Sequence, residues 1–225
     1  MIEKVKRRGA RSYGQFCGLA RALDLVGERW NLLIVRELLP GPLRYNELKT
    51  SLAGIATNLL AERLRTLEEN GILQRQLGDA GIRYALTPWG AELREPLEAL
   101  GRWGAPLVAS GRGDDSFHPR WLVLALPALL RGVTATPPAE LGLNIEGFSI
   151  VLHVDEHGPR AFAHPEHAAG TVIEAAPEIV VGLAAGAITV EQARTFIRVE
   201  GDASLLDAVF PAERSAVAPR LKPKT

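Results

Sequence analysis

Five residues with helical spacing carry the clearest chemistry in this sequence. They are Thr57, Asn58, Ala61, Glu62 and Arg65. At about 100° per residue, Asn58, Glu62 and Arg65 project, with Glu69, from the side of a helix opposite to an apolar stripe of Leu60, Leu64 and Leu67. Ala61 lies beside them, and Thr57 stands at the start of the helix. Amide, carboxylate and guanidinium groups on an exposed helix can read base edges in the major groove of DNA. For Glu62, the alternative is that it pairs with a neighbouring arginine and orients it.

The segments around this helix follow one another in the order of a winged helix. Residues 44–52 predict a first short helix, and Ala53-Gly54 provides the turn into the second. Residues 71–77 and 82–87 are strand-like, and the glycine-rich segment between them, Gly78-Asp79-Ala80-Gly81, predicts a β-hairpin. Helix, turn, helix and hairpin in this order are typical of a winged-helix DNA-binding domain.

Three basic residues near the second helix are predicted to contact DNA as well. We expect Arg44 and Lys49, on the first helix, to reach phosphates. Arg83 lies near the hairpin tip, from which an arginine can enter the minor groove, and the alternative is a solvated charge. Residues 1–110 hold sixteen Lys or Arg and twelve Asp or Glu, whereas residues 111–225 hold ten and fourteen. The basic half therefore contains the helix-turn-helix, as phosphate contact requires.

Length and composition predict two compact domains in the cytoplasm. The chain has 225 residues, 47% of them apolar, and no run approaches the roughly 18 apolar residues of a membrane span. The basic N-terminus has no apolar segment behind it, so it is not a signal peptide. We predict a DNA-binding and dimerisation domain over residues 1–110, a linker over 111–118, a second domain over 119–210 and a loose tail over 211–225.

The helices that flank the winged helix predict a homodimer. Residues 12–26 are expected to form a helix that has an apolar face and contributes to the dimer. Residues 28–39 are expected to form a second helix, with Trp30, Leu33, Ile34 and Leu38 directed inward. After the hairpin, Thr87 caps and Pro88 opens a third helix that runs towards Val108. Its apolar stripe consists of Leu93, Leu97, Leu100, Trp103 and Leu107. So apolar a helix at the end of a small domain usually packs against a second subunit.

The second half has the pattern of an α+β domain. Residues 145–155 alternate cleanly, which predicts a strand with one apolar face. An apolar helix kinked near Pro127 is expected over residues 119–131. Further strands are predicted at 160–164, 171–175 and 196–200, and further helices at 177–185, 189–195 and 203–210.

The first half resembles the HxlR-type, MarR-like winged-helix regulators of bacteria. The resemblance rests on residues 22–30, 33–38, 41–48, 58–71 and 84–87. It implies a homodimeric transcription factor that binds short inverted repeats in double-stranded DNA. Two positions depart from the family pattern: Ala56 replaces the serine that usually caps the recognition helix, which leaves Thr57 as the expected cap, and Asn58 replaces a basic residue or glutamine. The base preference of the family therefore does not carry over.

Residues 119–210 resemble a domain of the SCP2 (sterol carrier protein 2) type. The resemblance rests on residues 176–186, 189–193 and 197–202. It implies an α+β fold around an apolar tunnel, and hence a pocket for a hydrophobic small-molecule effector. The expected lining residues are Trp121, Phe148, Ile150, Leu152 and Phe162.

Cysteine and histidine provide no site of comparable strength. Some regulators resembling this chain sense electrophiles through a cysteine near the first helix, where Cys17 stands, but the favoured interpretation is a small buried side chain. Four of the five histidines fall between residues 153 and 167, without the converging spacing of a zinc site. We see no catalytic constellation and expect neither an enzyme nor a cofactor.

Three interpretations follow from these residues. The first is a dimeric transcriptional regulator whose second domain binds an apolar small molecule. The second is a lipid- or metabolite-binding protein in which the winged helix serves protein contacts. The third is a regulator whose second domain is a scaffold without a ligand.

Overall fold

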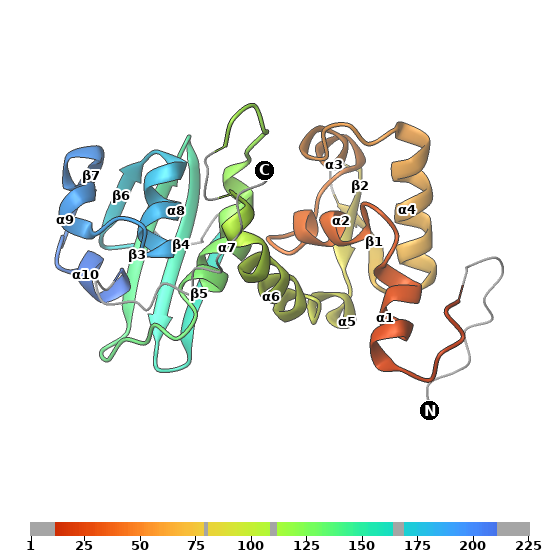
Figure 1. Ribbon diagram of the computed structural model, residues 1–225. Helices are drawn as coiled ribbons and strands as arrows, with labels where there is room; N and C mark the ends of the chain where they lie inside the picture. Colours follow the sequence, from red (N-terminus) through yellow and green to blue (C-terminus); the bar gives the residue numbers. More distant parts are fainter. Residues whose placement is uncertain (1–11, 79–80, 109–111, 164–168, 211–225) are drawn as a thin grey trace, which may run out of the picture. The chain divides into compact units, whose positions relative to one another are not determined.

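A computed structural model describes residues 12–78, 81–108, 112–163 and 169–210. Packing divides the chain into two compact units, residues 1–95 and 96–225, each with helices and a sheet (Figure 1). Among the described residues, no helix combines the length and the apolarity that crossing a membrane would need.

The first unit has the predicted winged-helix order. Its helices are α1 (Gly18–Val26), α2 (Asn31–Leu38), α3 (Tyr45–Ser51), α4 (Thr57–Glu69) and α5 (Pro88–Ala91), and its hairpin strands are β1 (Leu73–Gly78) and β2 (Gly81–Leu86). The strands pair antiparallel, with Leu73 opposite Leu86. An isolated bridge between Leu43 and Tyr84 ties β2 to the segment before α3. Apart from residues 79–80, which lie outside the described residues, the predicted hairpin is confirmed.

The first two helices are shorter than the sequence predicts. Helix α1 begins at Gly18, six residues after the expected start, and on its apolar face Phe16 and Leu19 are exposed, whereas Ala20 is buried. Helix α2 begins at Asn31, because Trp30 has a φ of 82°, in the left-handed region that a helix cannot continue through. Of the residues predicted to point inward from the second helix, Ile34 and Leu38 are buried, whereas the prediction is wrong for Leu33, which is 39% exposed.

The helix predicted from Pro88 to Val108 is broken into three parts. Thr87 caps α5 as expected, because its hydroxyl accepts the Gly90 NH at 3.0 Å. A new helix, α6, then runs from Arg94 to Gly104 and ends in the 3₁₀ turn η1 (Ala105–Val108). Pro96 explains the break: it has no NH to donate to Glu92, and its ring would clash with that carbonyl in a continuous helix. The predicted single helix is therefore wrong.

The second unit is built on a five-stranded mixed sheet. Its strands are β3 (Ala139–Ile145), β4 (Phe148–Asp155), β5 (Gly158–Ala163), β6 (Val172–Ala175) and β7 (Ile197–Glu200), in the order β5-β4-β3-β6-β7. Only β3 and β6 pair in parallel; the other neighbours are antiparallel. This arrangement confirms the predicted α+β class.

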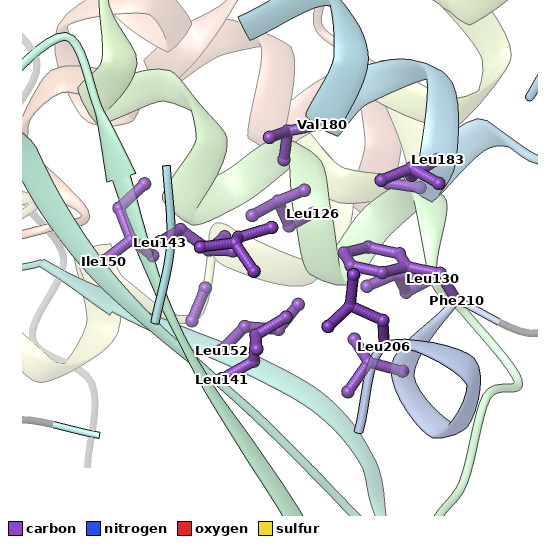
Figure 2. Close-up of a cluster of buried hydrophobic side chains, with 14 of the residues drawn as sticks. Leu126, Leu130, Leu141, Leu143, Ile150, Leu152, Val180, Leu183, Leu206 and Phe210 are labelled. Carbon is purple, nitrogen blue, oxygen red and sulfur yellow. The ribbon is translucent and has the colours of Figure 1, made fainter. Parts of the chain in front are cut away.

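Helices cover one face of this sheet and form the core with it. They are α7 (Leu122–Leu129), α8 (Pro177–Ala185), α9 (Val190–Ala193) and α10 (Leu205–Val209), with the 3₁₀ turns η2 (Pro119–Trp121) and η3 (Arg194–Phe196). Figure 2 shows side chains of α7, α8 and α10 converging on the inward residues of β3 and β4. Leu126, Leu141 and Leu152 are fully buried there. The whole inner face of the sheet therefore contributes to one continuous apolar core.

Candidate nucleic-acid interface

Helix α4 separates a buried apolar face from an exposed polar one. Leu60, Leu64 and Leu67 are at most 1% exposed, so they anchor the helix in the core of the first unit. The five residues predicted to face DNA are all exposed: Thr57, Asn58, Ala61, Glu62 and Arg65. The stripe of leucines thus directs the predicted reading face outward, which is what insertion into a major groove requires.

Several polar contacts fix α4 against its neighbours. The Tyr45 hydroxyl, from α3, donates to the Thr57 carbonyl at 2.7 Å, so it joins the two helices at the start of α4. On the side chain of Arg63, Nε donates to the Arg29 carbonyl at 3.3 Å and Nη2 lies 3.2 Å from the Glu28 carboxylate. This arginine is only 15% exposed. It therefore ties the middle of α4 to the loop that follows α1.

The hairpin is held against α4 at its base. Arg75, on β1, pairs with Glu68 near the end of α4 at 2.8 Å. The hydrogen bond and the negative charge of Glu68 raise the pKa of Arg75. Leu43 and Tyr84 exchange two backbone hydrogen bonds of 3.0 and 2.7 Å, which connect β2 to the start of α3. The hairpin is thus joined to both helices of the helix-turn-helix.

The predicted phosphate and groove contacts have different surroundings. Arg83 is exposed on β2, where a side chain can meet a minor groove. The Lys49 ammonium donates to the Ile55 carbonyl in the turn between α3 and α4, so in this structure it supports the turn. Arg44 is half-buried immediately before α3, and its Nε is buried without a hydrogen-bond partner among the described residues.

Two acidic residues, Glu62 and Glu69, lie on the exposed side of α4 and pair with arginines of the same helix. Glu62 pairs with Arg63 at 3.2 Å, which agrees with the alternative that Glu62 pairs with a neighbouring arginine and does not contact a base. Arg65 pairs with Glu69 one helical turn later at 2.9 Å, and both side chains are mostly exposed. Exposed pairs of this kind are worth only a few tenths of a kcal/mol. The Arg65 guanidinium can therefore exchange Glu69 for a phosphate at little cost.

Two predictions at the start of the two helices are wrong. The N-cap of α4 is Ala56, which offers no side-chain hydrogen bond, and Thr57 is already the first helical residue. Cys17 is exposed, at the N-cap position of α1. The predicted burial of Cys17 fails because α1 begins one residue later and because Phe16 beside it is fully exposed.

The residues predicted to line an apolar pocket do not all come together. Ile150 and Leu152 belong to the packed core of the second unit, and Phe148 packs against its edge. Phe162 is paired with Val151 and is 51% exposed, so it lies on the opposite face of the sheet from Ile150 and its place in this pocket is wrong.

Trp121 lies edge-on to two rings that precede it in the chain. Its ring centroid is 6.1 Å from that of Phe117 and 5.0 Å from that of His118. An open cleft of about 500 Å³ lies elsewhere in the second unit, lined by polar residues such as Asn144, Glu174 and Arg198. None of the predicted pocket residues lines this cleft.

The histidines of the second unit are similarly scattered. His153, on β4, lies 3.8 Å from the Glu140 carboxylate and 3.5 Å from that of Asp155. His157 is in the following turn, and its backbone NH donates to the Asp155 carboxylate at 2.8 Å. His164 and His167 lie outside the described residues.

Sequence reasoning missed the residues that position α4. The pattern of the first helix predicts Tyr45 as an apolar anchor and not as a hydrogen-bond donor to α4, and it predicts no role for Arg63. The signal for Arg63 was its place on α4 between the exposed and the buried stripes, where a long side chain can reach an adjacent segment while its stem stays buried.

Known proteins match the part of the chain that carries this interface. Residues 25–110 match the model of a family described as HxlR-like helix-turn-helix. The HTH-type transcriptional regulator YodB of Bacillus subtilis is 38% identical over 93 residues, which are 40% of this chain and 83% of YodB. The chain belongs to the HxlR-like helix-turn-helix family.

Other similar proteins have the same kind of name. The uncharacterized HTH-type transcriptional regulator YvaP of B. subtilis is 34% identical over 43% of this HxlR-like chain and 88% of its own length. Mb3122 of Mycobacterium bovis is also named an uncharacterized HTH-type transcriptional regulator. It is 40% identical over 38% of this chain and 56% of its own length. A solved structure of reduced YodB is 33% identical and covers 43% of this chain and 99% of its own, with a TM-score of 0.38.

The extent of the family match bears on the domain organisation. The match ends at residue 110, whereas packing divides the HxlR-like chain at residue 95. Within the predicted linker, residues 112–118 contain neither helix nor strand, and Arg112 lies 3.9 Å from Glu178 of α8. The boundaries of the predicted domains and the resemblance of the second domain to the SCP2 type stay predictions.

Proposed function

We propose that this HxlR-like chain is a homodimeric, sequence-specific DNA-binding transcriptional regulator that places α4 in the major groove. The observation that carries the proposal is the orientation of α4, with Leu60, Leu64 and Leu67 buried and Asn58 and its neighbours exposed. A polar helix face held by packing on a small rigid unit is the device by which helix-turn-helix proteins read bases. The family and the names of the relatives support the same role.

Exposed apolar side chains support the homodimer. On α1 and the residue before its cap, Phe16 is fully exposed and Leu19 is 69% exposed. At the other end of the family match, Trp103 of α6 and Leu107 of η1 are 77% and 64% exposed. Soluble proteins rarely expose large contiguous apolar patches to water. Both α1 and the α6–η1 segment are therefore suited to pack against a second copy of the chain.

The role of the second unit is proposed from its packing. Its core is continuous from α7 across β3 and β4 to α10, and the residues expected around an apolar ligand, Ile150 and Leu152, fill that core. This favours a scaffold over a hydrophobic-effector pocket. An effector would regulate DNA binding only if it preferred one dimer arrangement over another.

The experiment that tests the proposal is a DNA-binding titration of the purified full chain. Labelled duplexes that tile the region upstream of its own gene would be compared with shuffled duplexes of the same composition. We expect one or more genomic duplexes to bind with two chains per site and with half-sites about one helical turn apart. Equal affinity for every duplex would contradict sequence-specific recognition, and a stoichiometry of one chain per site would contradict the dimer.

A further inference from the structure

Three polar side chains form a row on the outer face of the sheet in the second unit. Asn144 of β3 is paired with Glu174 of β6, and Glu174 is paired with Arg198 of β7. Their neighbours along the strands, such as Leu143 and Ile173, belong to the core, and successive side chains of a strand point to opposite faces. A carboxylate and a guanidinium therefore lie on adjacent strands, with an amide beside them.

This row lies in the open cleft of about 500 Å³ in the second unit. The cleft is also lined by Glu146, in the turn between β3 and β4, and by Thr195 and Phe196, immediately before β7. Phe196 is 65% exposed, so a large apolar ring borders the polar groups. The volume falls within the range of about 300 to 1,000 Å³ that is common for small-molecule sites.

The charges of the row do not neutralise each other. Arg198 pairs instead with Glu200 of its own strand at 3.4 Å, and these side chains are 74% and 71% exposed. Exposed pairs contribute little, so the guanidinium can exchange Glu200 for another carboxylate. Among the described residues, the Glu174 carboxylate has no ion pair or hydrogen bond, and the buried amide oxygen of Asn144 has no hydrogen-bond partner. Both are acceptors for which this part of the chain provides no donor.

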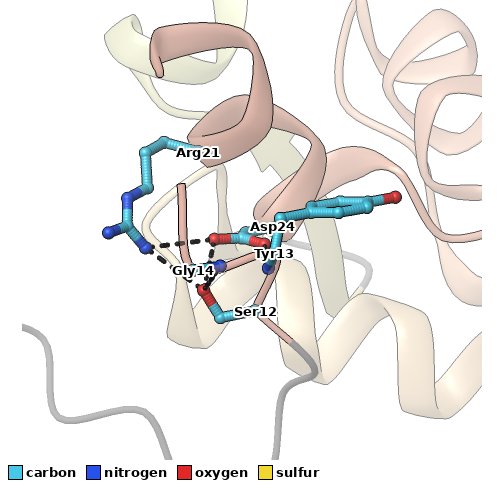
Figure 3. Close-up of polar contacts among 5 residues, drawn as sticks. All are labelled: Ser12, Tyr13, Gly14, Arg21 and Asp24. Carbon is cyan, nitrogen blue, oxygen red and sulfur yellow. Dashed lines mark hydrogen bonds and ion pairs between the residues drawn. The ribbon is translucent and has the colours of Figure 1, made fainter. Parts of the chain in front are cut away.

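A carboxylate that stabilises the fold has different surroundings, as Asp24 of the first unit shows. The Ser12 hydroxyl donates to Asp24 Oδ2 and the Tyr13 NH donates to Oδ1, both at 2.9 Å, and Arg21 pairs with the same carboxylate at 3.4 Å (Figure 3). The Asp24 side chain is fully buried, and its donors come from the chain itself. Glu174 is exposed and lacks such donors, so a ligand can supply them.

The charges in the cleft favour a ligand that carries an ammonium group. Glu146 and Glu174 bring two carboxylates, against the one guanidinium of Arg198. Among the described residues, no cluster of His, Cys, Asp and Glu has the composition of a metal site, so an organic cation is the better match. The planar guanidinium of Arg198 adds a site for a carboxylate. Opposite residues on antiparallel strands have Cβ atoms about 5 Å apart, so one small molecule can contact both charges.

We propose that this cleft binds the zwitterion of a small aliphatic α-amino acid. Its ammonium contacts Glu174, its carboxylate contacts Arg198, and its side chain packs against the ring of Phe196. An α-amino acid fits because both of its charged groups are attached to one carbon, which keeps them as close together as Glu174 and Arg198 are. The site goes beyond the proposed function, since it differs from a hydrophobic-effector pocket in place and chemistry and does not require DNA.

Three ligands test the proposal on the purified full chain. They are L-leucine, leucinamide, which lacks the carboxylate, and N-acetyl-leucine, which lacks the ammonium. Binding is followed by NMR titration at a pH of about 6.5, where leucinamide keeps its charge. We expect leucine to saturate the chain at millimolar concentrations, and each analogue to bind at least about 10-fold more weakly, because a hydrogen bond to a charged group is lost. Absence of saturable leucine binding, or equal affinity for all three ligands, would overturn the proposal.

Two variants assign the contacts. We expect Arg198→Gln to weaken leucine binding by about 10-fold or more and to leave leucinamide binding unchanged, because leucinamide has no carboxylate to lose. Glu174→Gln should weaken leucine binding similarly and leave N-acetyl-leucine binding unchanged. Glu156→Gln and Arg131→Gln are the matched controls, because both residues are exposed in the same unit and neither lines the cleft.

The controls should bind leucine as the wild type does. A control that loses as much affinity as the corresponding cleft variant would overturn the site, and so would a cleft variant that weakens leucine and its matched analogue equally. The ligand series on the wild-type chain decides the question even where a variant fails to fold. None of these titrations contains DNA, so their failure would leave the proposed function unaffected.

Discussion

Asn58 and Arg65 illustrate how a single residue gains its role from its neighbours. Both are exposed because the leucines of α4 occupy the core side of the helix. The Asn58 amide can both donate and accept, so it is suited to a base edge. Arg65 is held by Glu69 through an exposed pair, which leaves it available for exchange with a phosphate.

At this scale, we expect Asn58→Ala to change sequence preference. Loss of a bidentate base contact costs about 1 to 3 kcal/mol, so the variant should bind its preferred duplex about 5- to 150-fold more weakly. Its affinity for a shuffled duplex should stay at the wild-type value. Competition titrations with the two duplexes measure the ratio. An unchanged ratio would show that Asn58 reads no base.

The sequence predicts those features of the site that depend on the residue spacing within a single helix. The exposed face of α4 followed from the spacing of Leu60, Leu64 and Leu67. The contacts of Lys49 with the Ile55 carbonyl and of Arg63 with Glu28 join separate segments, and no periodicity within one helix can indicate them.

The elements differ most from their prediction where one residue interrupts a helical pattern. Pro96 breaks the apolar stripe after Thr87, and Trp30, in the left-handed region, delays α2. Strand β3 was missed, although Leu141, Leu143 and Ile145 alternate with polar or small residues and Glu146-Gly147 marks the turn into β4. The alternation and the turn are visible in the sequence, but the more apolar segments on either side, residues 121–130 and 148–154, are stronger features of the pattern.

The packing of α5 gives a test at the scale of the element. A Cβ on Gly90 would lie 1.9 Å from the Ile72 carbonyl oxygen, which is backbone and cannot turn away. We expect Gly90→Ala to lower the free energy of unfolding by about 1 to 3 kcal/mol or more. Gly101, inside α6, has open space around it and is the matched control, because Gly101→Ala should raise stability by about 0.5 to 1 kcal/mol. Denaturant titrations measure both, and equal effects would refute the close approach.

The exposed apolar residues of α6 give a second test. We expect Trp103→Glu to convert the proposed homodimer to a monomer, because a charge within the proposed apolar interface would be left without a partner. Leu77, on the hairpin, is 87% exposed and is the control, since Leu77→Glu should leave the dimer intact. Sedimentation at micromolar concentration distinguishes the two states. A dimeric Trp103→Glu variant would exclude α6 from the interface.

At the scale of the whole molecule, the chain joins an HxlR-like unit to an α+β unit with a separate core. We expect residues 114–215 alone to unfold cooperatively, since β3, β4 and their covering helices bury their apolar faces against one another. The filled core predicts an unchanged melting temperature with fatty acids, sterols and aromatic metabolites. A shift with any of these ligands would establish the effector pocket instead of the scaffold, and a fragment without a cooperative transition would refute the boundary.

Sequence-specific recognition by α4 is the central claim, and one titration addresses it most directly. The full chain is titrated at about 0.15 M salt with the best upstream duplex and with its shuffled counterpart. We predict that the upstream duplex binds at least about 1,000-fold more tightly, and that Asn58→Ala removes much of this difference. Equal affinity of the wild type for both duplexes would contradict the claim.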